Sequence, residues 1–432
     1  MKEVNIIDSI MGSGKTSWAK QYMNKYKDFQ NFIYVTPYLD EIENNVLLDC
    51  PFLTQPCSKK GKGSKLKDFK NLIKEGKSVI TTHALFGLFD KEVIELIENS
   101  DYIIIIDEVA NVIEQINQIS KDDIKHMLDS KLIEIEEGNN KVHWLVNDYK
   151  GVFQSKYINI KEQAEQGNIY SYNKEILFWT FPDKVFKIFK EVYILTYLFD
   201  GQIQRYYYDM FNISYKYYSI KKVDEIYELD EYNPLKENRG KYKEILNIYI
   251  GESNRNYTSN KLTGYELSVT WFSKANKEQL NRLKKNTYTY FRKHGKSDDN
   301  LWTTIKDMRT KLQGKGYTKG FIPWNTRATN NYQEKHNLAF LLNIYMNPIE
   351  KRFFENAGVK VNQDLLAVSS LLQWIWRSNI RKENATQVNL YIPSLRMRTL
   401  LYQWLDHKEV KFGMENVYVV YYEAEQRNKV FN

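Results

Sequence analysis

The chain has 432 residues, of which 42% are hydrophobic and 27% are charged, and its formal net charge is +8. This length and composition exclude a mainly disordered chain and indicate a globular protein of two or three domains. The mild positive charge favours a polyanionic partner such as nucleic acid, but it does not require one.

The residue types also bear on disulfides, metals and membranes. Two cysteines, Cys50 and Cys57, are too few for a disulfide framework or a four-ligand zinc site. The longest apolar run, 103–106, has the length of a strand, and the N-terminal MKEVNIIDSI is interrupted by Asp8 and too short for a signal peptide. We therefore expect no membrane association and a cytoplasmic location, in the host cell if a phage encodes the chain.

Strands and helices alternate along the first hundred or so residues. Apolar segments predict strands at 4–8, 32–36, 77–82 and 101–107, and helical periodicity predicts helices at 16–27, 39–48 and 89–98. Because these strands lack polar alternation, we expect a parallel sheet with helices on both faces. The basic segment 58–69 has no apolar periodicity and is expected to form an exposed loop.

Beyond residue 110 the pattern changes. We predict a mostly helical region with an aromatic-rich insertion at 110–190, a buried strand at 191–200, and antiparallel strands or a linking subdomain at about 203–250. A second α/β pattern contains an apolar segment at 267–273 before a basic helix, a strand at 287–291, helices at 363–382 and 396–405, and apolar segments at 338–346, 388–392 and 417–422. The predicted domains are 1–203 with an insertion at about 112–190, a β-rich linking segment at 204–261, and 262–432.

The most specific motif is SIMGSGKTS at 9–17, between a predicted strand and a predicted helix. A loop of this kind binds the phosphates of a nucleotide, here through Gly12, Ser13, Gly14, Lys15 and Thr16. Lys15 supplies a cation to the β- and γ-phosphates, and the Thr16 hydroxyl can ligate Mg²⁺. The first motif position is Ser9 instead of glycine, which leaves the GSGKT core intact.

A second motif, IIIIDEVAN at 103–111, ends a predicted buried strand with two carboxylates. Asp107 is expected at the carboxyl edge of the sheet near the phosphate loop, where it can hold Mg²⁺ through water. Glu108 can then orient and deprotonate an attacking water. The two adjacent acids favour hydrolysis over transfer of a phosphoryl group to a metabolite.

GSGKT followed by DEVAN resembles motifs I and II of superfamily 2 helicases, close to the DEAD/DEAH-box group and to helicase-like proteins encoded by bacteriophages. TPYLDEI (36–42) and TTHALF (81–86) resemble two further elements of the family, which touch the nucleic-acid backbone there. The resemblance implies this role for Thr36, Pro37, Thr82 and His83. LTYLFD (195–200) lies where motif III would be, and only Thr196 corresponds to its signature.

The second half of the chain extends the resemblance. RATN (327–330) resembles motif V, with Ala328 at the glycine position and Asn330 at the aspartate position. This implies that Arg327 and Thr329 contact nucleic acid.

LLQWIWRSNIR (371–381) resembles motif VI, although Trp376 stands at the glycine position and the last arginine comes one residue late. Gln373, Arg377 and Arg381 recur every four residues and would share one face of the predicted helix. Guanidinium groups so placed suit the charge that develops on a γ-phosphate. Either arginine could be the finger.

The resemblance implies two tandem RecA-like α/β domains that use ATP and Mg²⁺, and an ATP-dependent helicase or translocase in phage replication, recombination or repair. The implied partners are single-stranded, duplex or branched DNA, with RNA as an open alternative, and replication or recombination proteins. Basic segments at 59–67, 282–296 and 311–319 suit phosphate contact. The alternatives are a terminase-type motor that packages DNA and a P-loop nucleoside kinase.

Overall fold

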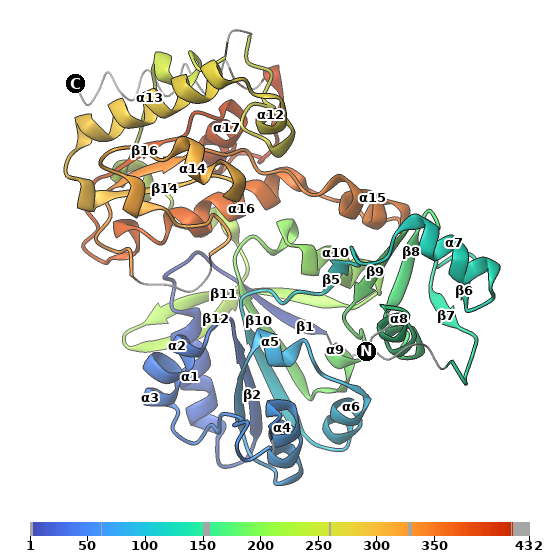
Figure 1. Ribbon diagram of the computed structural model, residues 1–432. Helices are drawn as coiled ribbons and strands as arrows, with labels where there is room; N and C mark the ends of the chain where they lie inside the picture. The colour runs from blue at the N-terminus through green and yellow to red at the C-terminus, as the bar shows by residue number, and fades with distance from the viewer. Residues whose placement is uncertain are drawn as a thin grey trace. The chain divides into compact units, whose positions relative to one another are not determined.

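The computed structural model describes residues 3–61, 63–149, 156–258, 261–326, 331–415 and 417 (Figure 1). The described residues of 1–9, 13–232 and 347–361 form one compact unit, and those of 10–12, 233–346 and 362–432 form a second. Each unit is built on its own sheet of mainly or wholly parallel strands accompanied by helices. The predicted α/β class is confirmed.

The first unit contains a seven-stranded sheet in the order β12-β11-β1-β10-β4-β2-β3. Its strands are β1 (Val4–Asp8), β2 (Asn31–Thr36), β3 (Val79–Thr82), β4 (Tyr102–Asp107), β10 (Glu191–Thr196), β11 (Tyr215–Val223) and β12 (Ile226–Glu231). All neighbouring strands are parallel except β11 and β12, which form an antiparallel hairpin. The five strands predicted up to residue 200 are therefore confirmed, and the hairpin realises the predicted antiparallel pairing after residue 203.

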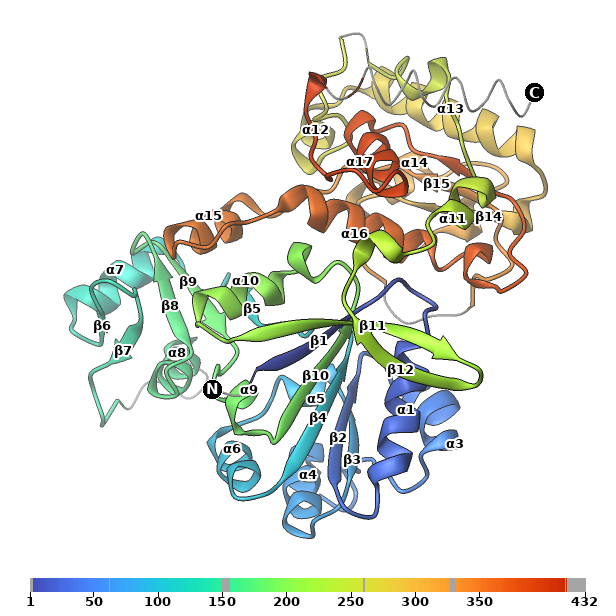
Figure 2. The ribbon, with the colours of Figure 1, turned by 180° about the vertical axis from the view of Figure 1, so that it is seen from behind.

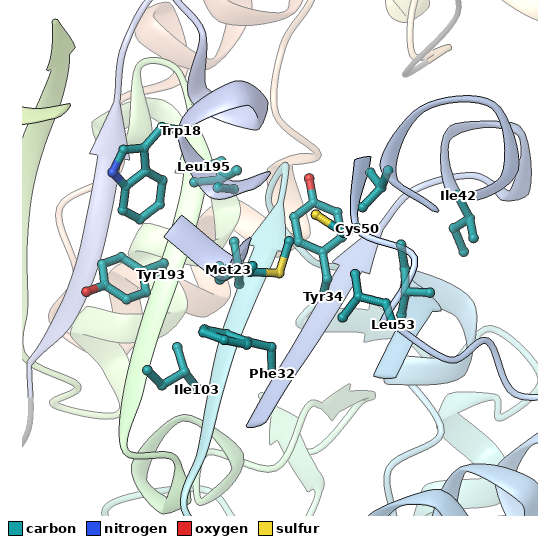
Figure 3. Close-up of a cluster of buried hydrophobic side chains, with 14 of the residues drawn as sticks. Trp18, Met23, Phe32, Tyr34, Ile42, Cys50, Leu53, Ile103, Tyr193 and Leu195 are labelled. Carbon is teal, nitrogen blue, oxygen red and sulfur yellow. The ribbon is translucent and has the colours of Figure 1, made fainter. Parts of the chain in front are cut away.

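Helix α1 (Lys15–Tyr26) covers one face of this sheet through an apolar cluster (Figure 3). Trp18 and Met23 from α1 pack there with Phe32 and other strand side chains, all nearly or fully buried. Alternate strand residues such as Ile104 are also fully buried. Both faces of the sheet are thus covered, as the lack of polar alternation predicts.

The other helices of the first unit that lie outside the insertion between β4 and β10 are shorter than α1. They are α2 (Leu39–Glu41), the π-helical turn Ile42–Val46, α3 (Leu47–Asp49), α4 (Lys65–Lys74), α5 (His83–Phe86), α6 (Lys91–Glu98), α10 (Ile203–Met210) and α15 (Pro348–Asn356). The prediction of a loop at 58–69 is wrong at its end, because α4 begins at Lys65. The Ser64 hydroxyl accepts a hydrogen bond from the Lys67 N–H and caps the helix, and the buried Phe69 and Leu72 anchor it.

Between β4 and β10 the chain forms an insertion with a core of its own. Its elements are β5 (Ile113–Gln115), α7 (Lys121–Asp129), β6 (Ile133–Ile135), β7 (Val142–Trp144), α8 (Lys156–Glu165), β8 (Ile169–Tyr172), β9 (Ile176–Thr180) and α9 (Val185–Ile188). The strands form a three-stranded sheet, β5-β9-β8, and a two-stranded sheet, β6-β7. The prediction that 110–190 is mostly helical is therefore wrong, because pairing between distant segments such as β5 and β9 fixes the strands.

The second unit contains a four-stranded parallel sheet in the order β13-β16-β15-β14. Its elements are α11 (Gly240–Ile245), β13 (Leu246–Ile248), α12 (Val269–Lys274), α13 (Lys277–His294), β14 (Asn300–Thr303), α14 (Arg309–Leu312), β15 (Asn337–Phe340), α16 (Gln363–Ile375), β16 (Val388–Tyr391) and α17 (Leu395–Leu405). The predicted segment 417–422 lies outside the described residues apart from Val417. No helix in the described part of the chain has the length and apolar character needed to cross a membrane.

Two predictions for the second unit are wrong. The segment 287–291 lies inside α13 and is not a strand, because Asn276 and Gln279 form a capping box that starts the helix. The predicted helix 363–382 ends at Ile375. The Ser378 hydroxyl donates to the Ile375 carbonyl, and the backbone continues in tighter turns, so that Arg377 and Arg381 leave the helix.

Candidate functional site

The predicted phosphate loop, residues 9–17, runs from the end of β1 into α1. Gly12 and Gly14 have φ values of 81° and 94°, in the left-handed region that favours glycine. The Lys15 ammonium donates a hydrogen bond to the Ser9 carbonyl, and the Ser9 N–H donates to the Thr196 carbonyl at 3.1 Å. The glycine-containing turn after β1 and the helix that begins at Lys15 agree with the sequence-based prediction, whereas phosphate binding by this loop stays a prediction.

Ser9, the departure from the usual motif, has a partner of its own. Its hydroxyl accepts a hydrogen bond of 2.9 Å from the Ile220 N–H in β11. A glycine at this position would leave that backbone donor without this acceptor. The serine thus ties the start of the phosphate loop to the β11–β12 hairpin.

Asp107 lies at the carboxyl end of β4, which only β10 separates from β1. Its Oδ2 accepts hydrogen bonds from the Thr16 hydroxyl at 3.2 Å and from the Tyr34 hydroxyl at 2.8 Å. The structure therefore brings together the two residues predicted to hold Mg²⁺.

The environment of Asp107 disfavours its negative charge. Burial, helped by the charges of Glu108 and Glu41, raises the pKa of the carboxyl from 3.8 to about 7, although Tyr34 and Lys15 act in the opposite direction. A bound divalent cation would supply the missing positive charge. The donor set, a buried carboxylate beside a hydroxyl, therefore fits Mg²⁺, which prefers oxygen ligands.

Glu108 follows directly and is partly exposed. Its backbone has a left-handed φ of 65°, which is unfavourable for a residue with a side chain. The Glu108 N–H donates to the Leu195 carbonyl at 2.9 Å, and this bond between β4 and β10 holds the turn. Such local strain is common at functional sites.

Sequence reasoning missed two residues that organise the site. Both oxygens of Asp8, which is 2% exposed, accept backbone hydrogen bonds, from Leu198 at 2.8 Å and from Phe199 at 2.9 Å. Tyr34 is fully buried, and its hydroxyl orients Asp107. The position of Asp8 at the end of a predicted strand is a signal that could have identified it. No sequence signal distinguishes Tyr34 from the other tyrosines.

The predicted nucleic-acid contacts of the first unit lie at neighbouring strand ends. Thr36 and Thr82 are paired in register at the carboxyl ends of β2 and β3. Thr36 is fully buried, whereas Pro37 and Thr82 are partly exposed. The Thr82 hydroxyl caps α5 by accepting from the Leu85 N–H at 3.4 Å.

His83 connects this region to the second motif. Its Nε2 lies 2.8 Å from the carbonyl oxygen of Asp107. It also lines a cavity of about 510 Å³, whose other walls include Asn111, Asn168 and Trp179. The cavity thus lies between α5, the segment after Glu108 and the insertion.

The predicted residues of the second half do not form the expected helix face. Gln373 lies in the last turns of α16 and is partly exposed, Arg377 is 6% exposed beyond the helix end, and Arg381 is exposed in a 3₁₀ turn at Asn379–Arg381. Arg327 and Thr329 lie outside the described residues. Their roles stay predictions.

Comparison with known proteins gives three kinds of match. The family model for the YonV C-terminal Rossmann-like domain matches residues 240–405, and that for the YonV middle domain matches residues 113–179. A protein of Bacillus subtilis strain 168, described as SPbeta prophage-derived uncharacterized protein YonV, is 38% identical over 427 residues, with 94% of this chain and 100% of the relative covered. A solved structure described as that of S. tokodaii Xpd4 is 14% identical, has a TM-score of 0.44, and matches over 96% of this chain and 95% of its own.

Proposed function

The chain belongs to the YonV family, and on that premise we propose that it is an ATP-dependent helicase or translocase that acts on DNA. The observation that carries the proposal is the contact of 3.2 Å between the Thr16 hydroxyl and Asp107, with Lys15 on the same loop and Glu108 next in the chain. These are the side chains that nucleotide hydrolysis by a phosphate-loop enzyme requires.

In this proposal Lys15 and the backbone N–H groups of Gly12–Thr16 bind the phosphates of ATP. Thr16 and Asp107 would hold Mg²⁺, which would neutralise negative charge on the phosphates. Glu108 orients a water molecule and accepts its proton as the water attacks the γ-phosphate, and the bond from the γ-phosphorus to the bridging oxygen breaks, so that ADP and inorganic phosphate leave. Arg377 or Arg381 is proposed to stabilise the charge of the transition state.

The link to nucleic acid is proposed to run through His83. The His83 side chain contacts the Asp107 carbonyl and also lines the cavity beside the insertion. A nucleic-acid strand bound in this cavity would therefore affect the position of Asp107, which is proposed to hold Mg²⁺. Lys and Arg of the basic segments would contact phosphates without reading the base sequence.

ATP hydrolysis with and without single-stranded DNA, duplex DNA, forked DNA and RNA tests the proposal. Nucleic acid is expected to stimulate turnover, and Lys15→Ala to abolish it. Glu108→Gln is expected to bind ATP like the parent while hydrolysis falls by about 10²-fold or more, because only the general base is lost. Glu95→Gln, at a 60% exposed side chain on α6, is the matched control and should hydrolyse ATP normally.

Two results would contradict the proposal. Hydrolysis by Glu108→Gln at the parental rate would remove Glu108 from the reaction. A turnover that no DNA or RNA changes at low salt would favour the nucleoside kinase, for which phosphoryl transfer to a nucleoside would then be measured.

A further inference from the structure

The β11–β12 hairpin lies against the phosphate loop and α1, as Figure 2 shows. The Ile220 N–H donates to the Ser9 hydroxyl at 2.9 Å. Farther along, the Gln21 side chain of α1 accepts from the Tyr227 N–H and donates to the Glu225 carbonyl, both at 2.9 Å. These bonds fix the hairpin at both the start of the loop and the helix that follows it.

The Tyr227 ring packs directly on the phosphate loop. A Cβ atom added to Gly14 would lie 1.9 Å from Cε1 of Tyr227, so the ring occupies the space beside the glycine. Tyr227 is partly exposed and packs at the margin of the apolar cluster of α1. An aromatic surface therefore borders the loop that is proposed to bind phosphates.

The sheet order shows which end of a nucleotide would meet this ring. Asp107 and β4 lie on one side of β1, beyond β10, whereas β11 and β12 lie on the other side. A nucleotide that lies across the sheet edge with its terminal phosphate facing Asp107 would direct its nucleoside end away from β4. That direction leads to the hairpin.

We propose that Tyr227 binds the nucleobase of ATP by stacking, and that the β11–β12 hairpin is the base-binding element of the site. The inference rests on the proposed function, since it assumes that the loop binds ATP. Stacking on an aromatic ring tolerates different bases. The site should therefore bind other nucleoside triphosphates as well, with an affinity that depends on the ring.

The test compares Mg²⁺·ATP with Mg²⁺·tripolyphosphate, which has the phosphates but no nucleoside, by calorimetric titration. Tyr227→Ala is expected to weaken ATP binding about tenfold, which corresponds to about 1.4 kcal/mol and lies within the range for base–aromatic stacking. It should leave the affinity for tripolyphosphate unchanged, and Tyr227→Phe should bind both ligands like the parent. Ile226→Ala, at the neighbouring side chain that is 60% exposed, is the control and should change neither affinity.

The outcomes separate this inference from the proposed function. An equal loss of affinity for both ligands in Tyr227→Ala would mean that the ring only supports the loop, and an unchanged affinity for ATP would mean that it does not touch the base. Either result overturns the inference while leaving ATP binding by the parent in place. A parent protein that binds neither ligand would overturn the proposed function itself.

Discussion

Replacing Asp107 by asparagine is expected to stabilise the protein in the absence of metal and nucleotide. Asparagine nearly keeps the shape of the side chain and can accept the hydrogen bond from Tyr34, but it carries no charge to bury. A pKa of about 7 in place of 3.8 means that the ionised carboxyl costs the folded state about 4 kcal/mol, at 1.36 kcal/mol for each pH unit. Asp107→Asn should recover much of this cost at pH 8.

The pH dependence gives the sign of the effect. Because the pKa of Asp107 is higher in the folded state, the parent loses stability as the pH rises from about 4 to about 7. The difference in free energy of unfolding between Asp107→Asn and the parent should accordingly grow by about 2 kcal/mol between pH 5.5 and pH 8.

Urea unfolding in EDTA, followed by circular dichroism, measures this difference, and Asp101→Asn, at an exposed residue next to the start of the same strand, is the control. A variant less stable than the parent at pH 8, or an advantage that does not change with pH, would refute the reasoning. The same substitution should abolish ATP hydrolysis, because the buried charge that reduces stability is the one proposed to hold Mg²⁺.

Two further predictions concern the insertion and its link to the site. His83→Ala should lower the ratio of DNA-stimulated to basal ATP hydrolysis about fivefold or more, because it removes the side chain that joins the cavity to the Asp107 carbonyl. An unchanged ratio would show that His83 does not couple DNA binding to hydrolysis. Ser120→Ala removes the hydroxyl that accepts from the Asp123 N–H, which is the side-chain half of the capping box at the start of α7. It should lower the free energy of unfolding by about 1 kcal/mol, which thermal melting measures and which an unchanged melting temperature would contradict.

The sequence predicted those features that neighbouring residues determine. An apolar run, a glycine-rich turn and an amphipathic helix lie within about 25 residues at 4–26, so the local pattern predicts the strand, the turn and the helix together. The run of isoleucines before Asp107 likewise identified a fully buried strand. In both cases the local pattern and the packing in the sheet agree.

Features that depend on contacts between distant segments could not be predicted in this way. The tyrosines and threonines at 287–291 favour a strand by composition, yet they belong to a helix whose capping box begins eleven residues earlier, at Asn276. At the end of α16 the Ser378 hydroxyl donates to the Ile375 carbonyl and so competes with the backbone N–H groups that would continue the helix. The spacing of four between Gln373, Arg377 and Arg381 contains no information on this contact. The contact of Tyr34 with Asp107 joins residues 73 positions apart, and no local pattern in the sequence indicates it.

The serine at the first position of the phosphate loop illustrates how a departure from a motif can have a structural cause. From the sequence alone, Ser9 only weakens the match. In the structure it is 4% exposed, and its hydroxyl holds β11, the strand that positions β12 and therefore Tyr227. Ser9 and Tyr227 are more than 200 positions apart in the sequence, but the hairpin connects them. It thereby joins the loop that would bind phosphates to the ring that would bind the base.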